Sequence, residues 1–172
     1  MTVWKSATAA LALLAGALLL LPGCGGASFN GQTYQGHGMA FRVGPVPPGW
    51  RRIDVGHALV AFRDDDAEAT IALNGRCNKD GDDVPLSALT HHLFLMFTHR
   101  NIIRQRTLPM DGRSAMRTEL VAELDGVPKH FIVYVLKKDS CVYDFIHIAA
   151  LNPPGTSTSA FERFVRGFAT SS

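Results

Sequence analysis

The sequence lacks the short motifs that carry most enzyme chemistry. It contains no G-x-S-x-G nucleophile elbow, no glycine-rich phosphate loop and no C-x-x-C pair. It also lacks a strong charge of either sign, because 17 Lys and Arg residues nearly balance 15 Asp and Glu residues over 172 residues. A chain so close to neutral has no overall electrostatic basis for binding nucleic acid, and we predict no nucleic-acid partner.

No apolar run is long enough to cross a bilayer comfortably. The longest covers residues 7–21 without a charge, whereas a spanning helix needs about 20 residues. Such a run behind Lys5 is typical of a signal peptide. It ends at the segment Leu21-Pro22-Gly23-Cys24, in which a leucine and a small residue precede the cysteine as in a lipobox. The alternative is an ordinary signal peptide that happens to contain a cysteine.

The lipobox interpretation divides the chain into three parts. Residues 1–23 are expected to be cleaved, leaving Cys24 as the lipidated residue, with acyl chains such as palmitate. Residues 24–38, which hold mostly small and polar side chains, are predicted to be a flexible tether. Residues 39–170 then form a single domain. Because Gly25 and not aspartate follows the cysteine, we expect an anchor in the outer membrane, with the domain facing the periplasm.

Cysteine is scarce, with three residues in the chain. If Cys24 carries lipid, Cys77 and Cys141 remain as an even pair, and the exported compartment is oxidising enough to permit a disulfide. The chain-entropy estimate for a loop of this length is about 4 kcal/mol of stabilisation. The alternative is two separate buried thiols, which behave as small hydrophobic groups.

The first half of the domain predicts four short strands and one helix. The strands, expected to form a meander, cover residues 39–43, 50–55, 58–62 and 68–73. Apolar residues then recur every three or four positions, which is typical of an amphipathic helix. This helix begins at Pro85 and ends near His99. Its expected buried face consists of Leu86, Leu89, Leu93, Met96 and Phe97.

The second half predicts long strands and a closing helix. The strands cover residues 102–110, 113–124, 129–136 and 141–150. Those at 129–136 and 141–150 are apolar on both faces, as a sheet covered on both sides requires. The closing helix spans 160–168, with Ser157 or Ser159 as its cap. The fold class is therefore α+β, an antiparallel sheet of about six to eight strands with two main helices packed on it.

Several features of residues 39–170 also occur in a characteristic order. They are Phe41, the turn Pro48-Gly49-Trp50, the strand 58–62, the helix 86–98, Gly112, the strand 141–145 and the start of the last helix at 161–164. This order resembles that of the PsbP-like α/β/α sandwich, shared by the extrinsic photosystem subunit and Ran-binding proteins. The resemblance implies docking and assembly rather than catalysis. No functional residue of that family maps onto this chain.

The seven histidines show no recognised metal-ligand spacing. His91 and His92 are adjacent on the predicted helix, so their side chains point about 100° apart and cannot chelate one ion. His130 and His147 lie on strands that could pair, but a metal site there needs a third ligand. We therefore predict no metal and no other cofactor.

Asp144 is the most unusual acid, because it stands within an apolar strand. If it is buried it requires a partner, and Arg117 or His130 are the candidates. An enzyme would require polar residues such as His130, Asp144 and His147 to converge in a cleft. Otherwise these residues are satisfied, structural polar groups.

The anchor, the resemblance and the missing catalytic motifs favour a non-enzymatic interaction or assembly module in the cell envelope. Its expected partners are the membrane, through the lipid anchor, and an envelope protein. The alternative is a small-molecule or lipid-binding accessory of envelope transport, with a pocket on an apolar sheet face that the helices cover only in part.

Overall fold

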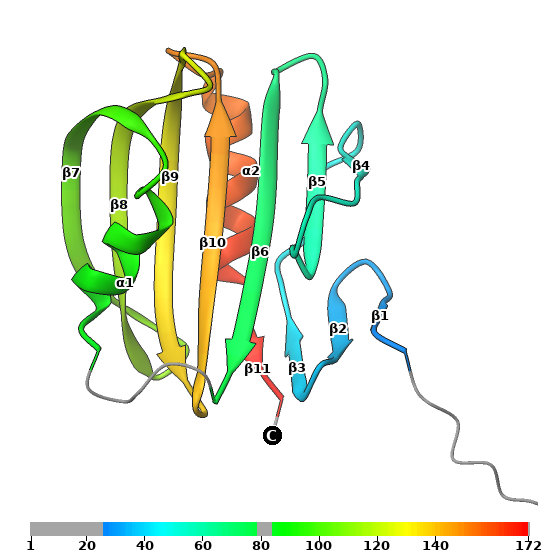
Figure 1. Cartoon of the computed structure of the whole chain (residues 1–172). Helices are drawn as coiled ribbons and strands as arrows, with labels where there is room; N and C mark the ends of the chain where they lie inside the picture. Colours follow the sequence, from blue (N-terminus) through cyan, green and yellow to red (C-terminus); the bar gives the residue numbers. More distant parts are fainter. Residues whose placement is uncertain (1–25, 79–83, 172) are drawn as a thin grey trace, which may run out of the picture.

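The structure is a computed structural model, which describes residues 26–78 and 84–171. Two antiparallel sheets and two helices make up these residues (Figure 1). The larger sheet has the order β4-β5-β6-β10-β9-β8-β7. Its strands are β4 (Arg51–Arg52), β5 (Val60–Asp64), β6 (Ala69–Cys77), β7 (Thr98–Met110), β8 (Arg113–Leu124), β9 (Val127–Lys138) and β10 (Cys141–Ala149). The smaller sheet has the order β1-β2-β3-β11, with β1 (Ser28–Phe29), β2 (Thr33–Gly36), β3 (Met39–Arg42) and β11 (Ala169–Thr170).

The two helices cover opposite faces of the seven-stranded sheet. Helix α1 (Leu86–Leu93) lies in front of β8 and β9 in Figure 1, and α2 (Gly155–Arg166) lies behind β10. Alternate residues of β9 therefore enter different cores: Ile132 packs with the α2 cluster and Val133 with the α1 cluster. The predicted α+β class, the six to eight strands and the α/β/α sandwich are confirmed.

The folded chain begins earlier than the sequence suggests. Residues 28–36 were expected to belong to the flexible tether of 24–38, but they form β1 and β2. The ring of Tyr34 is buried and stacks on Phe41 of β3, with 4.8 Å between the ring centroids. Burial of Tyr34 in this core accounts for the ordered segment despite its small, polar composition, and β3 pairs with β2 and β11 of the smaller sheet instead of joining the predicted meander. The predicted signal peptide and Cys24 lie outside the described residues.

Helix α1 is shorter than its apolar spacing predicts. It ends at Leu93, not near His99, and the amide of Phe94 donates to the carbonyl of His91, which closes a tight final turn. Leu89 is buried as expected, but Met96 is 93% exposed because it lies on the turn that leads into β7. The prediction that Met96 belongs to the buried helix face is therefore wrong.

The long strands and their turns match the sequence closely. Strand β8 has the predicted bounds, 113–124. Asp111 and Gly112 both have positive φ, 47° and 73°, as a two-residue turn between twisted strands requires. Helix α2 differs at its start, because Pro154 is its N-cap residue and no side chain caps it. Ser157 is buried inside the first turn instead.

The predicted disulfide is confirmed. Cys77 at the end of β6 is bonded to Cys141 at the start of β10, and the two residues are also direct partners in the antiparallel ladder. The bond joins residues 64 positions apart and closes a loop that contains α1, β7, β8 and β9. It therefore restrains the unfolded chain across most of the larger sheet.

Removing this disulfide should lower the free energy of unfolding by about 4 kcal/mol. We expect the Cys77→Ala, Cys141→Ala double variant, in a Cys24→Ala background, to unfold at lower urea concentration than its parent. A reductant should destabilise the parent to the same degree and leave the double variant unchanged. Equal unfolding free energies for the oxidised parent and the double variant would show that the bond contributes nothing.

Candidate functional site

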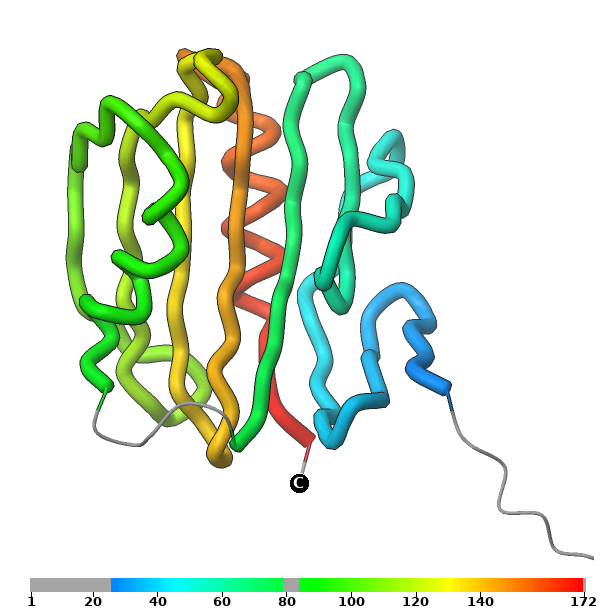
Figure 2. The backbone as a smooth tube through the Cα atoms, in the orientation of Figure 1, coloured from blue at the N-terminus to red at the C-terminus, as the bar shows by residue number. Residues whose placement is uncertain are grey.

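Strand β7 is the long edge of the seven-stranded sheet, opposite the two-residue edge strand β4, and lies far from the smaller sheet (Figure 2). Among the described strands it pairs only with β8. Residues 98–107 are all exposed, although they form part of a strand of 13 residues. A long edge strand presents unpaired backbone amides and carbonyls, which are able to bind another chain.

One face of β7 carries arginines. Ladder partners share a face, so Arg104, opposite Glu119, and Arg106, opposite Arg117, both lie on the face that α2 covers farther along the sheet. Arg117 is already neutralised by Glu119 at 3.0 Å and by Glu162 at 3.1 Å. In residues 26–78 and 84–171, neither Arg104 nor Arg106 forms an ion pair with an acidic side chain.

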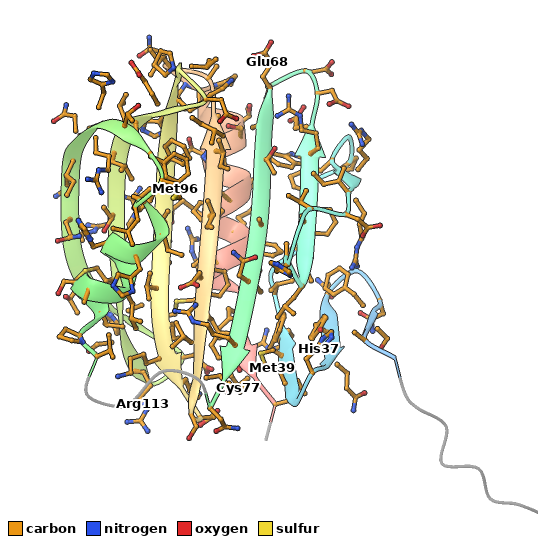
Figure 3. The ribbon with its side chains drawn as sticks, in the orientation of Figure 1. His37, Met39, Glu68, Cys77, Met96 and Arg113 are labelled. Atoms are coloured by element: carbon orange, nitrogen blue, oxygen red, sulfur yellow. A yellow bond between two sulfur atoms is a disulfide. The ribbon has the colours of Figure 1, made fainter. Side chains whose placement is uncertain are left out.

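The other face of β7 carries a small apolar hollow. It has a volume of about 290 Å³ and lies between α1, β7 and β8. Its lining includes Thr90, Phe94, Ile102, Gln105, Thr118 and Leu120. Leu95 and Met96 follow directly in the turn, with exposed fractions of 55% and 93%, and Figure 3 shows Met96 on this side of the sheet.

We refer to these exposed side chains together as the β7 surface. Its members are Leu95, Met96, Ile102, Ile103, Arg104 and Arg106. Contiguous apolar groups rimmed by polar ones mark interaction sites on soluble proteins. The sequence predicts 102–110 as an ordinary strand and does not by itself identify this surface. The available signal was the complete lack of acidic residues between Thr98 and Met110, together with cations at alternate positions.

A second, larger hollow lies between the two sheets. It has a volume of about 950 Å³, and its lining includes His37, Met39, His57 and Arg76. Figure 3 shows His37 and Met39 beside the Cys77 end of β6. Gly75 also lines the hollow, and a Cβ there would displace the ends of the Met39 and Leu59 side chains, which lie 2.7 Å from its position.

Asp144 is buried, as its apolar surroundings suggest, but its partner differs from the prediction. The carboxylate of Asp144 accepts a hydrogen bond from the guanidinium of Arg76, which lies on the neighbouring strand β6. Arg117 and His130 lie on the opposite face of the sheet and cannot reach it. The pair forms one wall of the larger hollow.

The three residues proposed for an enzyme do not converge. Asp144 and His147 are an odd number of positions apart on β10, so they point to opposite faces of the sheet. His147 stacks on Phe161, with 5.4 Å between centroids, and its Nε2 lies 3.2 Å from the hydroxyl oxygen of Ser157. His130 lies 3.1 Å from Glu119 instead. The described part of the chain contains no cluster of three or more metal-ligating side chains.

A cluster of polar side chains joins α2 to the sheet, on the same face as Arg104 and Arg106 of β7. The hydroxyl of Tyr134 donates to Glu162 of α2 at 2.5 Å, and Glu162 also binds Arg117. Burial, assisted by the Glu162 carboxylate, raises the pKa of Tyr134 to about 12, so its hydroxyl keeps its proton. Within the cluster, Glu119 and Glu162 both form ion pairs with Arg117.

No helix among the described residues has the length and hydrophobicity that a membrane span requires.

His147 should make stability fall as pH is lowered from about 6.5 to about 4. Burial, and then the nearby charge of His130, lower the pKa of His147 from 6.5 to about 4. The unfolded chain therefore binds a proton in this window that the native protein does not, and unfolding becomes easier by about 3 kcal/mol.

Urea unfolding at a series of pH values measures this effect. The His147→Leu variant should lose most of the dependence between pH 6.5 and 5, above the range in which carboxyls such as Glu119 titrate, whereas the exposed control His92→Leu should retain it. An unchanged slope in His147→Leu would contradict the assignment.

No family model matches the sequence, and no curated protein matches it. Solved structures match the fold. The solution structure of cyanobacterial PsbP (CyanoP) from Synechocystis sp. PCC 6803 has a TM-score of 0.60 at 18% identity, covering 88% of this chain and 99% of that one.

Two further solved structures have the same architecture. The crystal structure of LpqN, involved in cell envelope biogenesis of Mycobacterium tuberculosis, has a TM-score of 0.57 at 15% identity and covers 80% of this chain and 88% of that one. A crystal structure from Bacteroides thetaiotaomicron VPI-5482 has a TM-score of 0.55 at 8% identity, over 77% of this chain and 45% of that one. Sequence identities this low support a similarity of fold alone, and on that basis the chain has a PsbP-like fold.

Proposed function

We propose that this protein is a lipid-anchored lipoprotein of the outer membrane whose domain is a non-enzymatic interaction module, and that a partner protein docks on the β7 surface. The observation that carries the proposal is an edge strand exposed on both faces, with apolar side chains on one side and unpaired arginines on the other. The candidate catalytic residues are divided between two sheet faces, which supports a binding role.

The position of the expected anchor supports a protein partner over a membrane surface. Cys24 precedes Ser28 of β1 by four residues, a reach of about 14 Å even when fully extended. Strands β1 and β7 lie on opposite sides of the molecule (Figure 1). With a lipid on Cys24, the smaller sheet would be the part of the domain tethered near the membrane and β7 the part farthest from the attachment point.

The similarity to LpqN supports a role in the cell envelope, because that protein is involved in cell envelope biogenesis. The two proteins share a fold, and the signal peptide and lipobox that the sequence predicts would direct this chain to the cell envelope as well. What each one binds depends on its own surface side chains.

A second function is favoured by the larger hollow. Its volume of about 950 Å³ is in the range of small-molecule sites. Its wall holds Arg76 and Asp144 rather than a continuous apolar lining, so a polar ligand fits better than an acyl chain. The smaller hollow of about 290 Å³ lies on an apolar sheet face that α1 covers only in part, which is where the sequence predicts a pocket, but it is too small for more than one side chain or a small ligand. Native mass spectrometry of protein purified from envelopes should then show a bound small molecule, and a mass equal to the polypeptide with its lipid would oppose this function.

The anchor is tested by the intact mass of the mature protein. We expect a chain that begins at Cys24 and carries acyl groups, and we expect it in the membrane fraction. The Cys24→Ala variant should move to the soluble periplasmic fraction. A mature wild-type protein of unacylated mass would refute the anchor.

Docking is tested by photo-crosslinking in intact cells. A benzophenone amino acid in place of Met96 or Ile103 should give one discrete crosslinked protein, because both positions lie on the β7 surface. The same group at Asp66, an exposed residue in the turn between β5 and β6, is the matched control and should give none. Equal products from all three positions, or none from any, would contradict the proposal.

A further inference from the structure

We propose that the occupant of the β7 surface is an extended partner segment with alternating acidic and apolar side chains, which adds to β7 as an eighth strand of the larger sheet. The inference rests on the proposed function and names the chemistry of its partner. It combines three observations: an open backbone edge, two unpaired arginines on one face, and an apolar hollow on the other.

The backbone of β7 has one regular stretch available for pairing. The ladder with β8 is irregular between Thr98 and Asn101 and again between Ile102 and Arg104, and Pro109 lacks an amide proton. Residues 104–108 between these interruptions keep a continuous register. Alternate residues of this stretch direct their amides and carbonyls away from β8, where an added strand would bind them.

The arginine face specifies acidic side chains. Arg104 and Arg106 are two positions apart, which is the spacing of side chains on one face of a strand. Arg106 lies directly opposite Arg117, so the residue across the ladder offers it no carboxylate. Since Glu119 and Glu162 already bind Arg117, carboxylates two positions apart on the incoming strand would supply the missing opposite charge.

The opposite face specifies apolar side chains between the acidic ones. The residues that alternate with carboxylates on an added strand point toward the α1 side of the sheet. There the hollow of about 290 Å³, lined by Ile102 and Phe94, is large enough for one branched or aromatic side chain. Leu95 and Met96, the two residues after Phe94, add exposed apolar side chains. Backbone pairing then supplies affinity, and the hollow supplies specificity.

The same charges oppose a second copy of this chain as the occupant. Two β7 strands paired edge to edge would bring the row of Arg104 and Arg106 against its own copy. Arginine on an edge strand is also a device that prevents unwanted pairing. If preventing unwanted pairing is the only role of these arginines, no strand binds to β7. The peptide experiment distinguishes this role from strand addition.

The probe is a synthetic ten-residue peptide that alternates valine and glutamate, measured by fluorescence anisotropy against the detergent-purified full-length protein. We expect it to bind at least tenfold more tightly than a valine–lysine peptide. The Arg104→Glu, Arg106→Glu variant should reverse that preference, whereas Arg166→Glu, an exposed arginine on α2, should retain it. Loss of the preference in both variants would overturn the assignment to β7.

Backbone methylation separates strand addition from simple charge attraction. In an added strand, every second peptide amide faces β7 and the others face away. N-methyl groups on the amides that face β7 should abolish binding, and N-methyl groups on the other amides should leave the affinity unchanged. Equal binding of both methylated peptides would overturn the inference. A second result would also overturn the inference: the Cys24→Ala protein binds vesicles of phosphatidylglycerol, this binding requires Arg104 and Arg106, and the peptide does not bind.

These outcomes are independent of the docking test. If Met96 crosslinks to a partner but the alternating peptide does not bind, the partner chemistry is wrong and the interaction module remains. If the peptide binds but no partner is crosslinked in cells, the β7 surface is able to bind a strand, but the proposed function as a docking module fails.

Discussion

The constraint on which this structure depends is that its central strands are apolar on both faces. In β9, Ile132 and Tyr134 enter one core, and Val133 and Val135 enter the other. A sheet of this kind is stable only when both faces are covered. Helix α1 covers one and α2 the other, and the disulfide between β6 and β10 fixes the ladder at one end.

The same constraint explains where the molecule is open. Helix α1 reaches β8 and β9, and α2 packs on β10, with Glu162 extending to Arg117 of β8. Strand β7 lies beyond both helices and therefore carries side chains that water must solvate on either face. Its arginines and exposed apolar residues belong to neither of the two hydrophobic cores. For that reason we place the binding function there, and not in the buried polar cluster beneath α2.

Local patterns in the sequence predict much of the fold. Two-residue turns with Gly112 and Gly126 and alternating apolar residues give β8 its bounds, and the even cysteine pair gives the disulfide. The failures are non-local. Tyr34 is buried because Phe41 and the smaller sheet lie over it. Asp144 pairs with Arg76 because of the register between β10 and β6, which no spacing along the chain reveals. The β7 surface was missed because exposure of an edge depends on how far the helices reach.

Amide hydrogen exchange on the complex between this protein and its crosslinked partner tests the central claim most directly. The account predicts that outward-facing amides within residues 104–108 exchange rapidly in the free protein and are protected in the complex, while β1 and β2 exchange equally in both. Protection confined to the smaller sheet or to the hollow between the sheets, with β7 unchanged, would contradict it.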